Sequence, residues 1–165
     1  GIITGALFLC VGIIYERTHD RTIAKMGGLA ARTPVYAAVF GFFMMASVGL
    51  PGLAGFVGEF MVFLGTFDYS PIAAAVAVLV IIFGAVYLLW MYQRVIFGEV
   101  SDFLKGLGHH LTDMTAVEVL TLAPLAALTL LIGIYPALVL DFIQVPVDQL
   151  LAQVQQAVTT TGMLP

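Results

Sequence analysis

Long apolar runs separated by short polar connections form the pattern of this chain. Four such runs span residues 1–15, 34–67, 72–97 and 115–140, and a mildly amphipathic tail covers 141–165. The runs are nearly continuous rather than alternating, which favours membrane-spanning helices over a β-barrel. The pattern therefore predicts an all-α integral membrane protein with four spans, the first of them partial.

The second apolar run is interrupted in its middle, over residues 49–55. The interruption contains one proline and three glycines: Gly49, Pro51, Gly52 and Gly55. Glycine permits backbone angles that other residues resist, and proline removes a hydrogen-bond donor. As helices, residues 35–48 and 56–67 would rise only about 21 Å and 18 Å, and a bilayer core is about 30 Å thick. We therefore expect one discontinuous helix that crosses the membrane once.

The basic residues support a single crossing. All six lie in or beside the connections before the broken run and after the next one: Arg17, Arg21, Lys25, Arg32, Arg94 and Lys105. One crossing puts them all in one compartment, whereas a helical hairpin would divide them. By the positive-inside rule, their side is the cytoplasm or an equivalent matrix.

The amino-acid composition also indicates a membrane protein. Hydrophobic residues make up 61% of the 165 and charged residues only 10%, which is too little charge to cover a water-soluble surface. The single cysteine, Cys10, excludes a disulfide framework within this sequence and is interpreted as a packing residue. We interpret His109 and His110 as a solvated loop pair, and predict no metal site, cofactor site or nucleic-acid surface. Because the sequence begins at Gly1 inside an apolar helix, we expect a fragment of a longer protein.

Glu59 is the one residue that we single out for chemistry. It follows the interruption and lies about 12 Å along the helix from Phe67, near the middle of the membrane. The positions three and four residues away carry no charge, so any partner must come from another helix. Removal from water penalises the charged carboxylate, so we expect Glu59 to exchange a proton near neutral pH. Ionisable residues inside membranes commonly mark ion or proton pathways, and discontinuous helices build such sites.

Three stretches of the chain carry a resemblance to a known family. They are YERTHDRTIAKMGGL at 15–29, MASVGLPGLAGFVGEFMVFLGTF at 45–67 and MYQRVIFGEV at 91–100. In this order they resemble the antiporter-like subunit M (chain 4) of NADH-quinone oxidoreductase, respiratory complex I. The resemblance covers about residues 1–140 and implies the C-terminal four helices, one partial and one discontinuous, of a 14-helix antiporter-like fold.

The resemblance also implies a function. The chain would belong to a proton-translocating subunit that couples electron transfer from NADH to quinone, in partner subunits, to proton pumping. Glu59 would be the proton-transferring residue of the discontinuous helix. Flavin and iron–sulfur clusters are expected in partner subunits and no cofactor in this chain. Its partners would be other membrane subunits, lipid, protons and water, in a bacterial or mitochondrial inner membrane.

Two other functions stay open on the sequence. The same half-channel also occurs in multisubunit Na⁺/H⁺ antiporters and membrane-bound hydrogenases. Alternatively, Glu59 could be a protonated acid that only ties helices together, in a structural membrane domain without transport.

Overall fold

The computed structural model describes residues 1–161, apart from the side chains of residue 109 and residues 158–161. The chain divides into two compact units between residues 134 and 135. The first contains six α-helices and three 3-10 turns: α1 (Ile2–Thr18), η1 (Ile23–Lys25), η2 (Leu29–Ala31), α2 (Pro34–Val48), α3 (Ala54–Tyr69), α4 (Pro71–Ile96), α5 (Asp102–Gly106), η3 (Gly108–His110) and α6 (Ala116–Ile134). The second contains α7 (Ala137–Thr161). The prediction of an all-α protein is confirmed.

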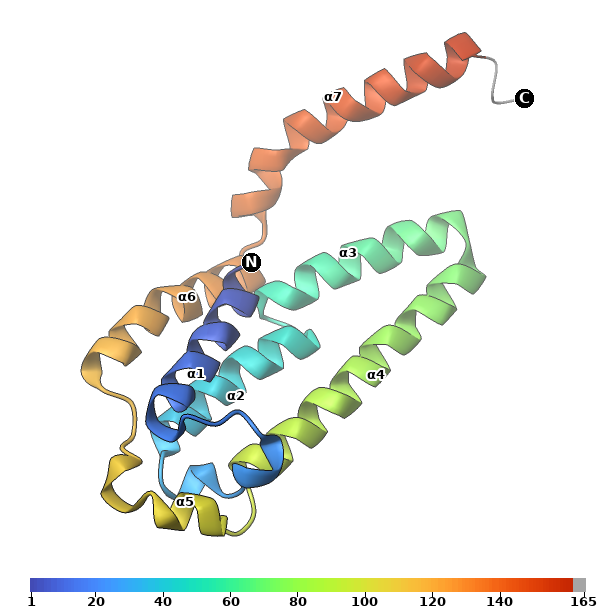
Figure 1. The fold of residues 1–165 in the computed structure, drawn as a ribbon. Coiled ribbons are helices and arrows are strands. Elements are labelled where there is room, and N and C mark those ends of the chain that lie inside the picture. Colours follow the sequence, from blue (N-terminus) through green and yellow to red (C-terminus); the bar gives the residue numbers. More distant parts are fainter. Residues whose placement is uncertain (162–165) are drawn as a thin grey trace. The chain divides into compact units, whose positions relative to one another are not determined.

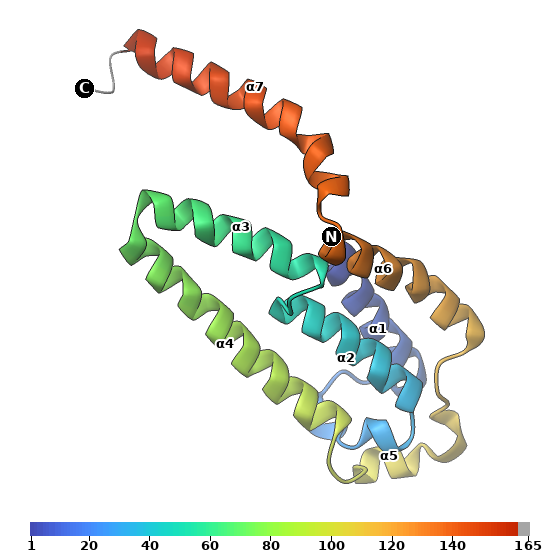
Figure 2. The same ribbon diagram turned by 180° about the vertical axis from the view of Figure 1, so that it is seen from behind.

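The interrupted run forms one discontinuous helix, as predicted. Helices α2 and α3 point in the same direction, one beyond the other, and α4 returns alongside both (Figures 1 and 2). With 15 and 16 residues, α2 and α3 rise about 22 Å and 24 Å. Helix α4, with 26 residues, rises about 39 Å. Neither half of the broken helix is long enough to cross a bilayer core of about 30 Å alone, but the two together are.

Several helix boundaries lie a few residues from the predicted ones. Helix α3 begins at Ala54, so the irregular backbone covers residues 49–53 and Gly55 lies inside the first helical turn. Helix α6 ends at Ile134 rather than at residue 140. Pro136 has no N–H to continue the hydrogen-bond ladder of α6. Its carbonyl instead accepts from the N–H of Leu140, 3.0 Å away, in the first turn of α7.

Both polar connections of the first unit meet at one end, which we call the basic end (residues 17–33 and 94–118). The N–H of Gly28 donates to the carbonyl of Phe97 at 3.2 Å, and the N–H of Ser101 donates to that of Gly27 at 3.0 Å. The structure thus brings the two basic connections together, as a single crossing requires. The α3–α4 turn, with Asp68, lies at the far end of these two helices (Figure 1).

The core of the first unit lies toward the basic end. Its fully buried side chains include Cys10, Leu29, Phe43, Ile96 and Leu104. Burial of the Cys10 thiol among apolar side chains agrees with a packing role. Helix α2 contributes six buried residues to the interior, whereas α3 contributes none.

Helix α7 forms the second unit. The sequence pattern predicts only a mildly amphipathic tail here, but the backbone is helical through Thr161 and includes Pro146. Residues 137–157, like α4 and α6, are long and apolar enough to cross a membrane. With several such helices, the chain is a multi-pass membrane protein.

Candidate functional site

Glu59 lies in the second turn of α3, directly beyond the irregular backbone. Helical side chains tilt toward the N-terminus of their helix, and the Glu59 side chain accordingly reaches back across the break to Gly49. A methyl group built at Gly49 would overlap Glu59 Oε2 and would lie 3.1 Å from its Cδ. The structure therefore places the predicted carboxylate and the first residue of the break side by side.

Gly49 ends α2 in a left-handed conformation, with φ 87° and ψ 38°. Its N–H and that of Leu50 both donate to the carbonyl of Met45, the latter at 3.1 Å. This arrangement stops the ladder of α2 and leaves carbonyls of its last turn without their usual donors. The break thus presents backbone acceptors next to the Glu59 carboxyl.

Two further glycines let backbone segments touch around the break. A methyl group at Gly55 would overlap the Ala46 carbonyl oxygen, so the first turn of α3 lies directly against the last turn of α2. A methyl group at Gly133, near the end of α6, would overlap the Gly52 carbonyl oxygen and lie 2.5 Å from Leu53 Cα. The glycines of the break and of α6 therefore hold the irregular segment by close backbone packing. The role of Gly133 has no clear signal in the sequence.

Glu59 carries an unpaired carboxyl within the described residues. Its side chain makes no hydrogen bond or ion pair with any other residue of the described chain, and it is only partly buried. At the membrane depth that the sequence predicts for Glu59, a carboxyl group is costly unless it is protonated or paired. Glu59 is therefore available to a proton or to a partner outside these residues.

Glu118, in the first turn of α6, has a different environment from that of Glu59. Arg17 donates to both of its carboxylate oxygens, at 2.8 Å each. The same guanidinium also donates to the carbonyls of Ile13, Thr112 and Asp113. The Arg17 and Glu118 side chains are only 10% and 19% exposed. This pair joins α1 to α6 and gives Glu118 a structural role.

Two acidic side chains, Asp113 and Glu118, cap the N-termini of α2 and α6. Asp113 accepts from the N–H groups of Val35 and Tyr36 at 2.8 Å and 3.0 Å, so it caps α2 from a distant part of the chain. Glu118 accepts from the N–H of Thr115 at 2.6 Å, while the Thr115 hydroxyl accepts from the N–H of Glu118. This reciprocal capping box follows from the Thr-x-x-Glu spacing at 115–118, a signal that sequence reasoning missed.

Adjacent charges in sequence are not paired with each other at the basic end. Asp20 pairs with Lys25 at 2.5 Å, and this hydrogen bond holds the pKa of the Asp20 carboxyl well below its usual range. The Arg21 guanidinium lies 4.5 Å from the centre of the Tyr15 ring. In the described part of the chain, no three His, Cys, Asp or Glu side chains gather in a way that could hold a metal ion.

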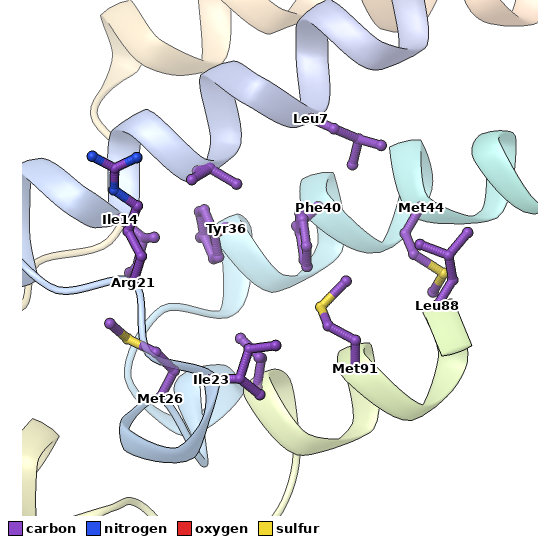
Figure 3. Close-up of a pocket in the computed structure, with 12 residues that line it drawn as sticks. Leu7, Ile14, Arg21, Ile23, Met26, Tyr36, Phe40, Met44, Leu88 and Met91 are labelled. Carbon is purple, nitrogen blue, oxygen red and sulfur yellow. The ribbon is translucent and has the colours of Figure 1, made fainter. Parts of the chain in front are cut away.

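A separate cavity of about 280 Å³ lies between α1, α2 and α4 (Figure 3). Its lining is almost wholly apolar, with residues such as Leu7, Phe40, Met44 and Met91, and Arg21 lies at its edge. Glu59 is not among its lining residues. The cavity therefore offers no chain of polar groups to the carboxyl at the break.

Comparison with known sequences decides the family. Residues 1–84 match the profile of the family described as "NADH:quinone oxidoreductase/Mrp antiporter, TM", and this match covers the broken helix with Glu59. The chain belongs to this family.

Among curated proteins, members named NADH-quinone oxidoreductase subunit M resemble it over most of its length. The protein from Rhodobacter capsulatus is 54% identical over 144 residues, which is 87% of this chain and 27% of that protein. The one from Rickettsia conorii is 42% identical over 153 residues, covering 93% and 30%. The chain thus spans less than a third of the length of these relatives.

Solved structures show the same fold. A chain of respiratory complex I from Thermus thermophilus, with bound NADH, superposes with a TM-score of 0.71 at 38% identity, covering 81% of this chain and 27% of that one. A chain of the Mrp complex from Dietzia sp. superposes with a TM-score of 0.69 at 24% identity, covering 85% and 34%. The second match shows only the fold.

Proposed function

We propose that this chain is part of a proton-translocating membrane subunit of NADH-quinone oxidoreductase, in which Glu59 takes up and releases a proton. Family membership and the identity with subunit M sequences support this function. The observation that carries the role of Glu59 is its carboxyl group beside Gly49 at the break, without a partner among the described residues.

The geometry suits proton transfer rather than electron transfer. A carboxyl group can donate a proton when neutral and accept one when charged, and the break offers backbone carbonyls and room for non-helical backbone at membrane depth. In this proposal the redox chemistry, with flavin and iron–sulfur clusters, belongs to partner subunits. Other membrane subunits, lipid and water complete the path, in a bacterial or mitochondrial inner membrane.

The test is Glu59→Gln in the full-length subunit within the intact complex. Glutamine keeps the shape and hydrogen-bonding capacity but cannot titrate, so proton pumping coupled to NADH oxidation should fall by about tenfold or more. Pumping is measured as acidification in membrane vesicles, and native gels check assembly. Asp68→Asn, at the far α3–α4 turn, is the control and should pump normally. Wild-type pumping by assembled Glu59→Gln complex contradicts the proposal and favours a structural membrane domain.

A second candidate is a subunit of a multisubunit Na⁺/H⁺ antiporter, because the family and the fold include Mrp proteins. The higher identity to subunit M sequences favours complex I. Co-purification of the tagged full-length protein discriminates between them. Partners that carry flavin and iron–sulfur clusters support complex I, whereas partners without redox groups support the antiporter.

A further inference from the structure

Gly49 and Gly52 have similar backbone conformations but different surroundings. Both adopt left-handed conformations, with φ 87° and φ 92°, which strain any residue that has a side chain. A methyl group at Gly52 would meet nothing within 4 Å, whereas one at Gly49 would overlap the Glu59 carboxyl group. Conformation alone therefore explains Gly52, but Gly49 meets a second requirement.

The second requirement is space for the Glu59 carboxyl. The position of a Cβ atom at Gly49 lies 3.1 Å from Glu59 Cδ and 3.5 Å from Oε1, and it overlaps Oε2. These atoms belong to the end of the side chain and are not part of its stem. A side chain at Gly49 would thus displace the group that carries the proton.

We propose that Gly49 is a positioning residue for Glu59: its missing side chain leaves the space in which the carboxyl group lies against the end of α2. The inference rests on the proposed function of Glu59. In this place a protonated carboxyl can donate to the carbonyls of the last turn of α2, which the break leaves without their usual donors. Displaced from it, the same carboxyl faces the apolar surroundings of α3.

The test compares Gly49→Ala with Gly52→Ala in the full-length subunit within the intact complex. Both substitutions impose a similar backbone strain, so native gels should show a similar effect on assembly. In the assembled fraction, protons pumped per NADH oxidised should fall about tenfold for Gly49→Ala and stay within about twofold for Gly52→Ala. Equal pumping by the two assembled variants overturns the positioning role.

A double-mutant cycle with Glu59→Asp separates positioning from general damage. Aspartate is one methylene shorter, so its carboxyl withdraws from Gly49 and Glu59→Asp alone should already pump less than wild type. Adding Gly49→Ala to Glu59→Asp should then lower proton pumping by no more than about a further twofold, because the shorter aspartate side chain no longer fills the space beside Gly49. Independent, additive losses overturn the proposal.

The variants distinguish three outcomes: a complex that does not assemble, a wrong positioning role for Gly49, and a wrong proposed function for Glu59. If Gly49→Ala does not assemble, Glu59→Asp still decides, because its wild-type pumping would show that the place beside Gly49 is unimportant. If Glu59→Gln loses pumping while assembled Gly49→Ala keeps it, only the positioning role is wrong. If assembled Glu59→Gln itself pumps normally, the proposed function is wrong as well.

Discussion

The basic end and the break hold their helices by opposite means. At the basic end, long polar side chains join distant segments: Arg17 binds Glu118, and Asp113 caps α2. At the break, glycines let backbone atoms touch, with Gly55 against Ala46 and Gly133 against Gly52. Side-chain bonds tolerate small displacements of the helices, whereas backbone contacts fix them through volume alone.

The two kinds of contact, side-chain bonds and glycine backbone packing, suit the two regions in which they occur. The basic end contains both polar connections, so its charged side chains find partners of opposite charge, as Arg17 does in Glu118. In the proposed function the break lies at membrane depth, where each additional polar side chain carries a cost. Glycine contacts leave Glu59 as the one ionisable side chain of α3 near the break. Fixing the break without polar groups keeps competing partners away from this carboxyl.

The largest effect is expected for Arg17→Ala. It leaves Glu118 partly buried and without its cation, and removes bonds to three carbonyl groups, so the subunit should lose about 3 kcal/mol of stability. The measurement is the temperature at which the purified complex loses this subunit. Arg21→Ala, which removes the contact with Tyr15, should cost no more than about 1 kcal/mol. Equal losses for the two variants would show that the Arg17 cluster does not hold the basic end.

A smaller loss is expected for Gly133→Ala at the break. The added methyl group meets the backbone of Gly52 and Leu53, which cannot rotate away as a side chain would, so the cost is about 2 kcal/mol. Loss of assembled complex and lower proton pumping are the readouts. Gly84→Ala in α4, where nothing lies within 4 Å of the new methyl group, is the matched control. Normal assembly and pumping by Gly133→Ala would contradict backbone packing as the means that fixes the break.

The smallest effect is expected for Asp113→Ala. It removes the cap of α2 but leaves its buried face, so the loss is about 1 kcal/mol. Hydrogen exchange in the intact complex should become faster at the first turn of α2 and stay unchanged in α3. Asp102→Ala, whose carboxylate pairs with Lys105 at the surface, should change stability by roughly a few tenths of a kcal/mol. Unchanged exchange at α2 would show that the cap contributes nothing.

The helices with simple apolar patterns could be predicted from the sequence. Helix α4 was expected at 72–97 and lies at Pro71–Ile96, because an unbroken apolar run follows a proline that suits a helix start. The end of α6 was missed since apolar residues continue on both sides of Pro136. The helix boundary there depends on the N–H that Pro136 lacks, and this single missing donor does not change the hydropathy pattern.

The candidate site was only partly predictable. Glycines, a proline and a lone carboxylate identify a broken helix and Glu59, because each has a specific chemical consequence. That Glu59 lies against Gly49 could not be predicted, since the direction of α3 depends on irregular backbone angles in residues 49–53. The pairing of Arg17 with Glu118, 101 positions apart, has no periodic signal at all.

The distant cap of α2 has a consequence for biosynthesis. Asp113 is made 77 positions after Tyr36, whose N–H it accepts. At about 5–20 residues per second, the ribosome needs roughly 4 to 15 s to cover that distance. Helix α2 therefore enters the membrane before its own N-terminus can be completed, and α3 and α4 are synthesised in the interval. Gly133 is made 20 positions later still, so the order of translation makes the contact of α6 with the break form after the cap of α2.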